Sequence, residues 1–360
     1  MTGVAITVIL QGATADRCAV QVSPLAELCA ALHALEEAEH HPASRDWVAA
    51  ARAGAPELLA EAAGWAPLWG SLRARYFYPL DARGERTLDD ELAVVGDLPP
   101  RSFAAMSVEA IIDRDRTLPY DRVLDDPDAR ARFLEHARRF SARRLALATR
   151  LTEDPDGCRA ALLAFLRAFA DRAFAVEWAR VRPPLRDDAE RRRRDLRRRG
   201  PGVIGEVTAT AQERHGPHRV VFDKLYQAMA RVGADPCLLL PSAHVGPHVV
   251  IKHAAGLPVV IQYAAGDLPE TPFEEVNRRL RALSDPGRMQ LSRALLRGRR
   301  TTVDLAHYTG MSEPQVSRHL RRLREAGLVR TSREGRLVFY ELDADAVRAI
   351  GADLIAALWR

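Results

Sequence analysis

The chain has 360 residues, of which 47% are hydrophobic and 28% are charged, and these proportions exclude fibrous, disordered and disulfide-stapled proteins. This length exceeds what one ordinary core needs, so we expect two or three domains. Only 6% of the residues are aromatic while Ala and Leu are abundant, which indicates a helix-rich protein rather than a β-sandwich.

The net charge of +5 is concentrated near one end of the chain. Residues 271–360 contain 17 Arg against 11 Asp and Glu, a net of +6, which leaves −1 for residues 1–270. Arg binds phosphates and base edges through a planar fork of donors. A small basic region joined to a large, nearly neutral one therefore indicates nucleic-acid binding coupled to a second activity.

The cysteines and the apolar runs point to a cytoplasmic protein. Neither a disulfide framework nor a thiolate zinc site is expected, because no Cys-x-x-Cys pair occurs among the four widely spaced cysteines, Cys18, Cys29, Cys158 and Cys237. The apolar run at residues 4–10 follows no Lys or Arg, so it indicates a strand rather than a signal peptide. No uninterrupted apolar run reaches ~18 residues, and we expect no membrane partner.

The first 115 residues mix strand and helix patterns. Apolar, β-branched runs predict strands at residues 4–10 and 19–22. Ser23 followed by Pro24 predicts the start of a helix. Its apolar residues recur on one stripe, at Leu25, Leu28, Ala31, Leu32 and Leu35.

The next two sections differ in their apolar period. Residues 116–200 keep helical spacing and predict two or three helices. Residues 201–268 predict a β-rich section, because apolar runs separated by Pro and Gly occur at 220–222, 238–240, 249–251 and 259–261. Turn residues cluster from Gly266 to Pro272. We therefore expect an effector or interaction domain at residues 1–268 and a second domain at residues 270–360.

Two helices with apolar stripes flank the C-terminal domain. The first begins at Thr271-Pro272, and the last ends near residue 358. A unit of ~90 residues is too small to bury both stripes internally. We expect them to form a two-fold dimer interface through Phe273, Val276, Leu280, Ile350, Leu354 and Leu358.

A helix-turn-helix pattern lies between these flanking helices. Thr301 or Thr302 caps a short helix, Gly310 turns the chain, and the next helix starts at Ser312. The polar face of that helix fits the major groove of DNA, and the hairpin after it forms a wing at the backbone or minor groove. We expect DNA contacts from Thr302, Ser312, Gln315, Ser317, Arg318, His319, Arg321, Arg322, Arg333 and Arg336.

The sequence here resembles a known family. The run Met311-Ser312-Glu313-Pro314-Gln315-Val316-Ser317-Arg318-His319-Leu320, followed by Leu323 to Val329, is similar to the winged helix-turn-helix of ArsR/SmtB-type repressors. That resemblance covers about residues 273–358 and implies a homodimer that binds a pseudo-palindromic operator in double-stranded DNA. The region around Ser23-Pro24-Leu25 and Leu240-Pro241-Ser242 resembles an uncharacterised domain fused to such repressors in actinobacterial regulators, and this resemblance implies no ligand.

The metal sites of that family are not expected here. The stretch that matches its cysteine pair, residues 302–306, has no thiol, and the acidic residues of the last helix have no histidine partner. Upstream, His244, His248 and His253 recur, but His248 and His253 would point to opposite faces of a strand, with no acidic ligand close by in the sequence. We expect no metal and no other cofactor.

Two further patterns have ordinary interpretations. Residues 200–205 match G-x-G-x-x-G, but they follow an Arg-rich helix instead of a strand, which favours a plain loop. In the Arg run at residues 186–199, acidic residues four positions from Arg favour a solvated helix face, with phosphate contact as the alternative.

The remaining candidates concern a ligand and catalysis. Trp65, Trp69, Tyr76 and Tyr78 are core residues or, alternatively, line the pocket of a small organic effector. No G-x-S-x-G, H-E-x-x-H or P-loop motif occurs, so no enzyme is expected. The sequence predicts an α+β protein, with an N-terminal mixed α/β domain and a C-terminal winged helix, that acts as a homodimeric transcriptional repressor. The alternative is an enzyme whose winged helix provides feedback control.

Overall fold

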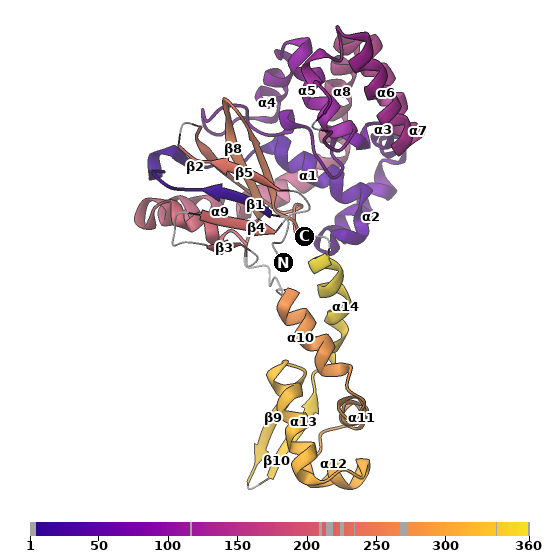
Figure 1. Cartoon of the computed structure of the whole chain (residues 1–360), viewed down its shortest axis with the longest axis vertical. Coiled ribbons are helices and arrows are strands. Elements are labelled where there is room, and N and C mark those ends of the chain that lie inside the picture. Colours follow the sequence, from indigo (N-terminus) through magenta and orange to yellow (C-terminus); the bar gives the residue numbers. More distant parts are fainter. Residues whose placement is uncertain are drawn as a thin grey trace. The chain divides into compact units, whose positions relative to one another are not determined.

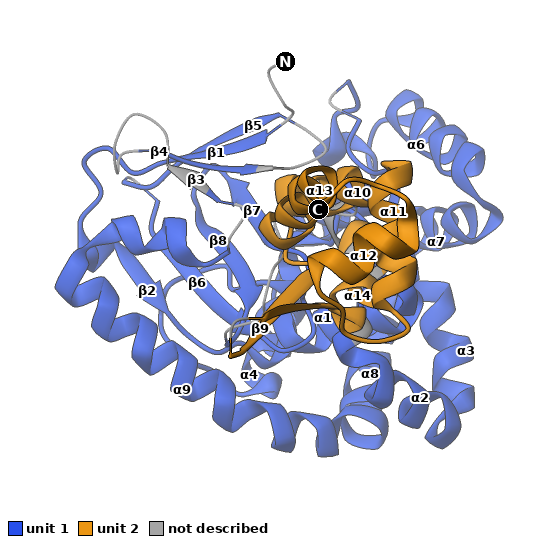
Figure 2. Cartoon of the chain, turned by 90° about the horizontal axis from the view of Figure 1, so that it is seen from below, with its two compact units in different colours: residues 1–268 blue, residues 269–360 orange. Residues whose placement is uncertain are grey.

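A computed structural model describes residues 5–115, 117–208, 211–213, 219–223, 227–233, 235–266, 273–335 and 337–358. The chain divides into two compact units, Met1–Leu268 and Pro269–Arg360 (Figure 2). Mixed helix and sheet in these residues confirm the predicted α+β class. In the described part, no helix is long and apolar enough to cross a membrane.

Unit 1, Met1–Leu268, combines a helical layer with two sheets (Figure 1). Its α-helices are α1 (Pro24–Glu36), α2 (Arg45–Gly54), α3 (Pro56–Trp65), α4 (Leu88–Gly96), α5 (Pro100–Ile111), α6 (Pro127–Phe140), α7 (Ala142–Glu153), α8 (Pro155–Phe169) and α9 (Ala175–Arg199). The described residues after 116 thus contain four helices up to residue 199, and the prediction of two or three was wrong. The reason is local, because the side chains of Ser141 and Asp154 each cap a new helix.

The two sheets join segments far apart in the sequence. One has the strand order β3-β4-β1-β5 and the other β2-β6-β8-β7. The strands are β1 (Ala5–Ile9), β2 (Cys18–Val20), β3 (Gln212–Glu213), β4 (Arg219–Asp223), β5 (Ala228–Arg231), β6 (Cys237–Ser242), β7 (Val250–Ala254) and β8 (Leu257–Ala264). In the second sheet, β2, β6 and β8 are parallel and β7 is antiparallel to β8. Cys18 therefore lies opposite Cys237 although 218 residues separate them, and both thiols are free.

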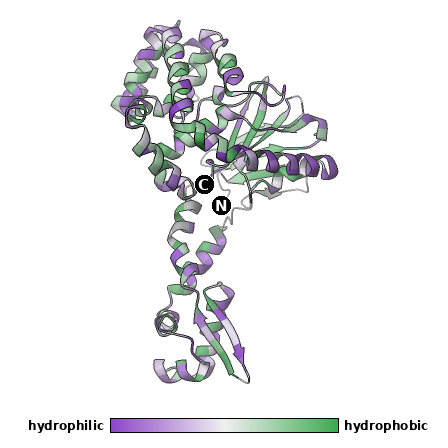
Figure 3. Cartoon of the chain, turned by 180° about the vertical axis from the view of Figure 1, so that it is seen from behind, coloured by the Kyte–Doolittle hydropathy of each residue, from purple (hydrophilic) through white to green (hydrophobic). Residues whose placement is uncertain are grey.

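The second sheet is buried on both faces. Leu238 and Leu240 of β6 belong to the helical core, whereas Cys237 and Leu239 belong to a core that α9 shares with both sheets. This alternation follows from the two-residue period of a strand, and it explains why β6 is an uninterrupted apolar run. Figure 3 shows hydrophobic residues along these strands and a largely hydrophilic α9.

Helix α1 lies against β6 on the helical side, and α9 contacts β2 and β6. The predicted single stripe on α1 was incomplete, because every residue from Pro24 to Leu35 is buried. Polar side chains of α1 are therefore enclosed in the protein as well, which matters for Glu27 and His33 below.

Unit 2, Pro269–Arg360, is the predicted winged helix. Its described elements are α10 (Phe273–Leu283), α11 (Pro286–Leu295), α12 (Thr302–Thr309), α13 (Glu313–Glu325), β9 (Val329–Glu334), β10 (Leu337–Leu342) and α14 (Ala344–Leu358). A core of its own includes Leu291, Leu305, Leu320 and Leu328. The predicted turn cluster from residue 267 to 272 lies outside the described residues.

Candidate nucleic-acid interface

Two capped helices and a tight turn set the direction of α13. Thr301 caps α12, since its hydroxyl accepts the Asp304 backbone N–H at 3.3 Å while Asp304 accepts the Thr301 N–H at 2.9 Å. Gly310 ends α12 with φ +71°, a left-handed conformation that favours glycine. The chain can then turn at once into α13, which starts after Ser312.

Helix α13 has one buried and one exposed face. Val316, Leu320 and Leu323 are 0–1% exposed and belong to the core of unit 2. The predicted DNA-contacting residues on the opposite face are exposed, namely Gln315, Ser317, Arg318, Arg321 and Arg322. Thr302, in the first turn of α12, is half-buried.

These exposed side chains differ in the hydrogen bonds and ion pairs that they form within the protein. The Gln315 Oε1 atom accepts hydrogen bonds from the Ser312 N–H at 3.0 Å and the Ser312 hydroxyl at 3.1 Å. Arg321 and Arg322 lie 3.8 Å and 3.4 Å from carboxylate oxygens of Glu325. Among the described residues, none forms an ion pair with Arg318, so its guanidinium can bind a base without first breaking an ion pair.

His319 lies against the protein rather than on the exposed face. Its Nδ1 is 3.7 Å from a carboxylate oxygen of Asp285, which caps α11 by accepting the Arg288 N–H at 2.9 Å. Its Nε2 is close enough to Gly287 that a Cβ there would stand 3.1 Å away. This placement suits a residue that positions α13 against α11.

The wing is the hairpin of β9 and β10. Leu337 pairs with Glu334 and Leu342 with Val329, so the tip falls at Gly335, which has φ +60°. Arg333 is exposed beside this tip. Arg336, also predicted to contact DNA, lies outside the described residues.

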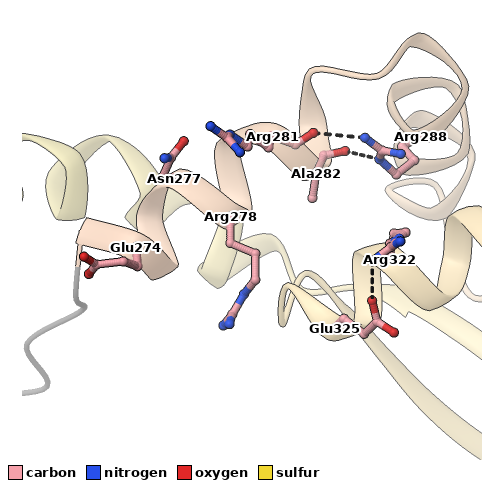
Figure 4. A pocket seen from close by; sticks show the side chains of 8 residues that line it. All are labelled: Glu274, Asn277, Arg278, Arg281, Ala282, Arg288, Arg322 and Glu325. Atoms are coloured by element: carbon pink, nitrogen blue, oxygen red, sulfur yellow. Dashed lines mark hydrogen bonds and ion pairs between the residues drawn. The ribbon is translucent and has the colours of Figure 1, made fainter. Parts of the chain in front are cut away.

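A basic hollow of about 360 Å³ lies between α10, α11 and α13 (Figure 4). It is lined by Glu274, Asn277, Arg278, Arg281, Ala282, Arg288, Arg322 and Glu325. The Arg288 guanidinium donates to the last carbonyls of α10, at 2.5 Å to Ala282 and 3.0 Å to Arg281. The sequence analysis did not single out this hollow, because its residues come from three helices.

The predicted dimer stripes are partly used inside unit 2. Helices α10 and α14 pack on each other, and Val276 and Ile350 are only 0% and 6% exposed. These two residues therefore leave little surface for a dimer interface, and the interface stays a prediction for the other residues. Phe273 and Leu280 remain 47% and 37% exposed, Leu354 is half-buried, and Ile355, which the prediction missed, is 48% exposed. The side chain of Leu358 is outside the described set.

The four aromatic candidates in unit 1 lie in the helical core. Trp65, Trp69, Tyr76 and Tyr78 are at most 3% exposed. The Trp69 ring stacks near Phe165, and the Tyr76 ring stacks on Phe103 with centroids 5.0 Å apart. None of the four lines the basic hollow or a second hollow of about 300 Å³ near Pro24, Arg86 and Trp178.

His244 is the centre of a buried ionic cluster. Its Nδ1 lies 2.7 Å from Glu27 Oε1 and its Nε2 lies 3.0 Å from Glu177 Oε1. Burial alone would lower the pKa of His244, but hydrogen bonds with Glu177 and Glu27 raise it to about 9. The sequence has no acidic ligand close to this histidine, and the fold brings both glutamates to it from distant helices, α1 and α9.

A second histidine cluster was not foreseen. The cluster consists of His33 in α1, His41 between α1 and α2, and His248 before β7. One ring nitrogen of each histidine lies within 4.8 Å of the others. Of these, only His248 was considered from the sequence. No local spacing joins residues 33, 41 and 248, so only the fold could reveal this grouping.

Two family comparisons cover most of the chain. Residues 4–269 match the family described as "Family of unknown function (DUF5937)", and residues 285–331 match "Bacterial regulatory protein, arsR family". The chain is 37% identical over 102 residues to the "Probable mercury resistance operon repressor" of Streptomyces lividans, covering 26% of this chain and 82% of that protein. It is 36% identical over 88 residues to the HTH-type transcriptional regulator KmtR of Mycobacterium tuberculosis, covering 24% and 68%.

Solved structures resemble slightly less than a quarter of the chain. The transcriptional repressor BigR from Xylella fastidiosa is 35% identical, covering 22% of this chain and 82% of that one, with a TM-score of 0.20. A homodimeric winged helix-turn-helix domain from Mycobacterium bovis is 30% identical, covering 23% and 79%, with a TM-score of 0.21. From the two family matches and the Streptomyces lividans relative, the chain belongs to the DUF5937 family and carries at its C-terminal end a DNA-binding domain of the bacterial arsR family of repressors.

Proposed function

We propose that the protein is a sequence-specific, homodimeric transcriptional repressor that reads its operator with α13. The observation that carries this proposal is the division of α13 into a buried stripe of Val316, Leu320 and Leu323 and an exposed face with Gln315 and Arg318. Arg reads guanine in the major groove through two parallel hydrogen bonds. Arg333 beside the wing tip supplies a phosphate contact of the sequence-independent kind.

The dimer part of the proposal rests on the exposed apolar residues of α10 and α14. Phe273, Leu280 and Ile355 lie on two helices that pack on each other, and exposed apolar side chains of this size favour association. A two-fold axis through this surface would present two copies of α13 to half-sites about 10 bp, or a multiple of that, apart.

Unit 1 is proposed to be the part that responds to an effector. Its charge is close to neutral, so it has little electrostatic attraction for DNA. An organic effector at Trp65, Trp69, Tyr76 and Tyr78 stays a prediction, and it would require the tightly packed helical core to open. A tenfold change in operator affinity needs only ~1.4 kcal/mol of coupling between the two sites.

The proposal is tested by selecting binding sequences from random double-stranded DNA with the full-length protein. We expect a pseudo-palindromic site, and Arg318→Ala should lose ~1–3 kcal/mol of binding and its preference at one base pair of each half-site. Arg348→Ala is the matched control, because this arginine is exposed on α14 and pairs with Asp345. Equal loss of affinity for selected and random DNA in Arg318→Ala would contradict base reading by α13.

A further inference from the structure

Three histidines meet inside unit 1, well away in sequence from the DNA-binding helices. The ring centroids of His33 and His41 are 5.0 Å apart, those of His41 and His248 are 5.1 Å apart, and those of His33 and His248 are 6.1 Å apart. One ring nitrogen of each lies within 4.8 Å of the other two. Tetrahedral zinc holds its imidazole nitrogens roughly 3.3 Å apart, a spacing that modest ring rotations can reach from here.

Backbone carbonyls fix the tautomers of two of these rings. His33 Nδ1 is 2.8 Å from the carbonyl oxygen of Trp69, and His41 Nδ1 is 2.7 Å from that of Gly246. A carbonyl oxygen can only accept a hydrogen bond, so both Nδ1 atoms carry protons and donate them. The lone pairs therefore lie on Nε2, and a carbonyl on the far nitrogen is the usual support of a metal-bound histidine.

The Nε2 atom of His41 is enclosed in the protein. His41 is 0% exposed, and within the described part of the chain its Nε2 has no hydrogen-bond partner. A buried ring nitrogen without a hydrogen-bond partner calls for an explanation, and a bound metal ion would supply one.

We propose that His33, His41 and His248 bind one divalent transition-metal ion of the zinc class. Among the described residues the cluster contains imidazoles and no carboxylate, and such a set favours Zn²⁺, Co²⁺, Ni²⁺ or Cu²⁺ over Mg²⁺ or Ca²⁺. Three protein ligands leave one tetrahedral position open. Because Arg73 is buried nearby and repels a cation, that position should hold an anion such as hydroxide or chloride. The inference does not depend on the proposed DNA-binding function.

The test is metal binding by the full-length, tag-free protein after treatment with a chelator. Zn²⁺ should bind with a stoichiometry of one per chain in a calorimetric titration and should raise the melting temperature. Co²⁺ should give the visible absorption bands of a four-coordinate ion. X-ray absorption of the Zn²⁺ form should show nitrogen neighbours at roughly 2.0–2.1 Å.

Substitutions assign the site. His41→Ala and His248→Ala should each weaken Zn²⁺ binding at least tenfold, with the circular dichroism spectrum unchanged. His307→Ala is the control, because this histidine is exposed on α12, and it should bind Zn²⁺ like the wild type. If either cluster variant misfolds, the Co²⁺ absorption and X-ray absorption spectra of the wild type still test the proposal. Sulfur ligands, or oxygen ligands alone, around the metal would overturn it. No stoichiometric binding by the wild type, or full binding by both folded variants, would overturn it as well.

Discussion

The helix cap observed at Gln315 and the base contact proposed for it depend on the same amide group. In the free protein its Oε1 accepts two hydrogen bonds from Ser312 and so closes the start of α13. A bidentate contact with adenine also needs that oxygen together with the amide nitrogen. The proposed DNA binding through Gln315 would therefore exchange a helix cap for a base contact.

Gln315→Glu separates these two roles. A glutamate at this position keeps the capping arrangement and suits the positive end of the helix, so the free energy of unfolding should change by less than ~0.5 kcal/mol. The added negative charge should weaken operator binding at least tenfold, because it faces the phosphate-rich duplex. Denaturant unfolding and fluorescence titration with the selected DNA measure the two effects, and unchanged affinity would exclude Gln315 from the interface.

The buried cluster around His244 makes stability depend on pH. The folded-state pKa of His244 is about 9, above its usual 6.5, so the stabilisation is complete below pH 6.5 and is lost as the pH rises toward 9. Burial opposes ionisation of Glu177, but hydrogen bonds from Arg180 and His244 lower its pKa to about 2. Its contribution is therefore complete above pH 4.5 and is lost as the pH falls toward 2.

His244→Gln isolates the alkaline part of this dependence. Because Lys252 and Glu91 both have a pKa of about 7, the informative quantity is the difference in unfolding free energy between wild type and variant. This difference should shrink by on the order of 2 kcal/mol between pH 6.5 and 9, measured with a chelator present. His307→Gln should track the wild type throughout, and a constant difference for His244→Gln would show that this histidine does not titrate as an ion pair.

At the scale of elements, α10 and α14 each have an inner and an outer side. Val276 and Ile350 are buried between them and the core, and Arg279 joins the two helices by an ion pair with Asp353 at 3.0 Å. The outer side keeps Phe273, Leu280 and Ile355 exposed. The proposed association between chains would thus use different residues of these helices from those that pair α10 with α14.

If the protein is the dimer proposed above, the double variant Phe273→Glu, Leu280→Glu should be a monomer at micromolar concentration. Charges on both residues would face their symmetry copies across a two-fold axis, where like charges repel and desolvation is costly. Sedimentation velocity of the full-length protein measures the change. Val303→Glu on α12 is the control, because Val303 is 60% exposed but lies on another helix. A double variant that still sediments as a dimer would place the interface elsewhere.

The elements of unit 2 were predictable because their signals are local. Caps at Asp285, Thr301 and Ser312, and the left-handed Gly310, mark helix ends within a few residues of sequence. In unit 1 the same kind of signal gave the start of α1 at Pro24 but missed the break at Ser141. A serine inside a continuous helical period can cap a helix or lie within one, and its sequence context does not decide between them.

At the scale of the whole chain, the two units have separate cores. Among the described residues, the core of unit 2 draws on residues from Ala282 to Ile350, and the cores of unit 1 draw on residues up to Ala264. A fragment of residues 269–360 should therefore fold alone and keep operator binding. Calorimetry of the full chain should resolve two unfolding transitions, one of which matches the fragment. A single transition together with an unfolded fragment would mean that unit 2 needs unit 1 to be stable.

The chemistry of unit 1 could not be predicted, because its partners meet only after folding. His33 and His41 approach His248, and Glu27 and Glu177 approach His244, in each case across at least 67 residues of sequence. Lys252 and Gln262 gave no signal either, although both are buried beside Arg73. The apolar period and the capping residues of the sequence indicate on which face of its own helix or strand a residue lies. They do not indicate which other helix or strand that face contacts.

The pairing of β1 and β2 has a consequence for synthesis of the chain. These strands are the first to be made, yet β1 pairs with β4 and β5, and β2 pairs with β6, more than 200 residues later. Contacts between residues so far apart in the sequence form slowly, because closing the long loop between them costs chain entropy before strand pairing offsets it. On the ribosome, helices α4 to α9 can begin to pack while both N-terminal strands still expose apolar edges. Those edges are where a chaperone would act and where truncated chains would aggregate.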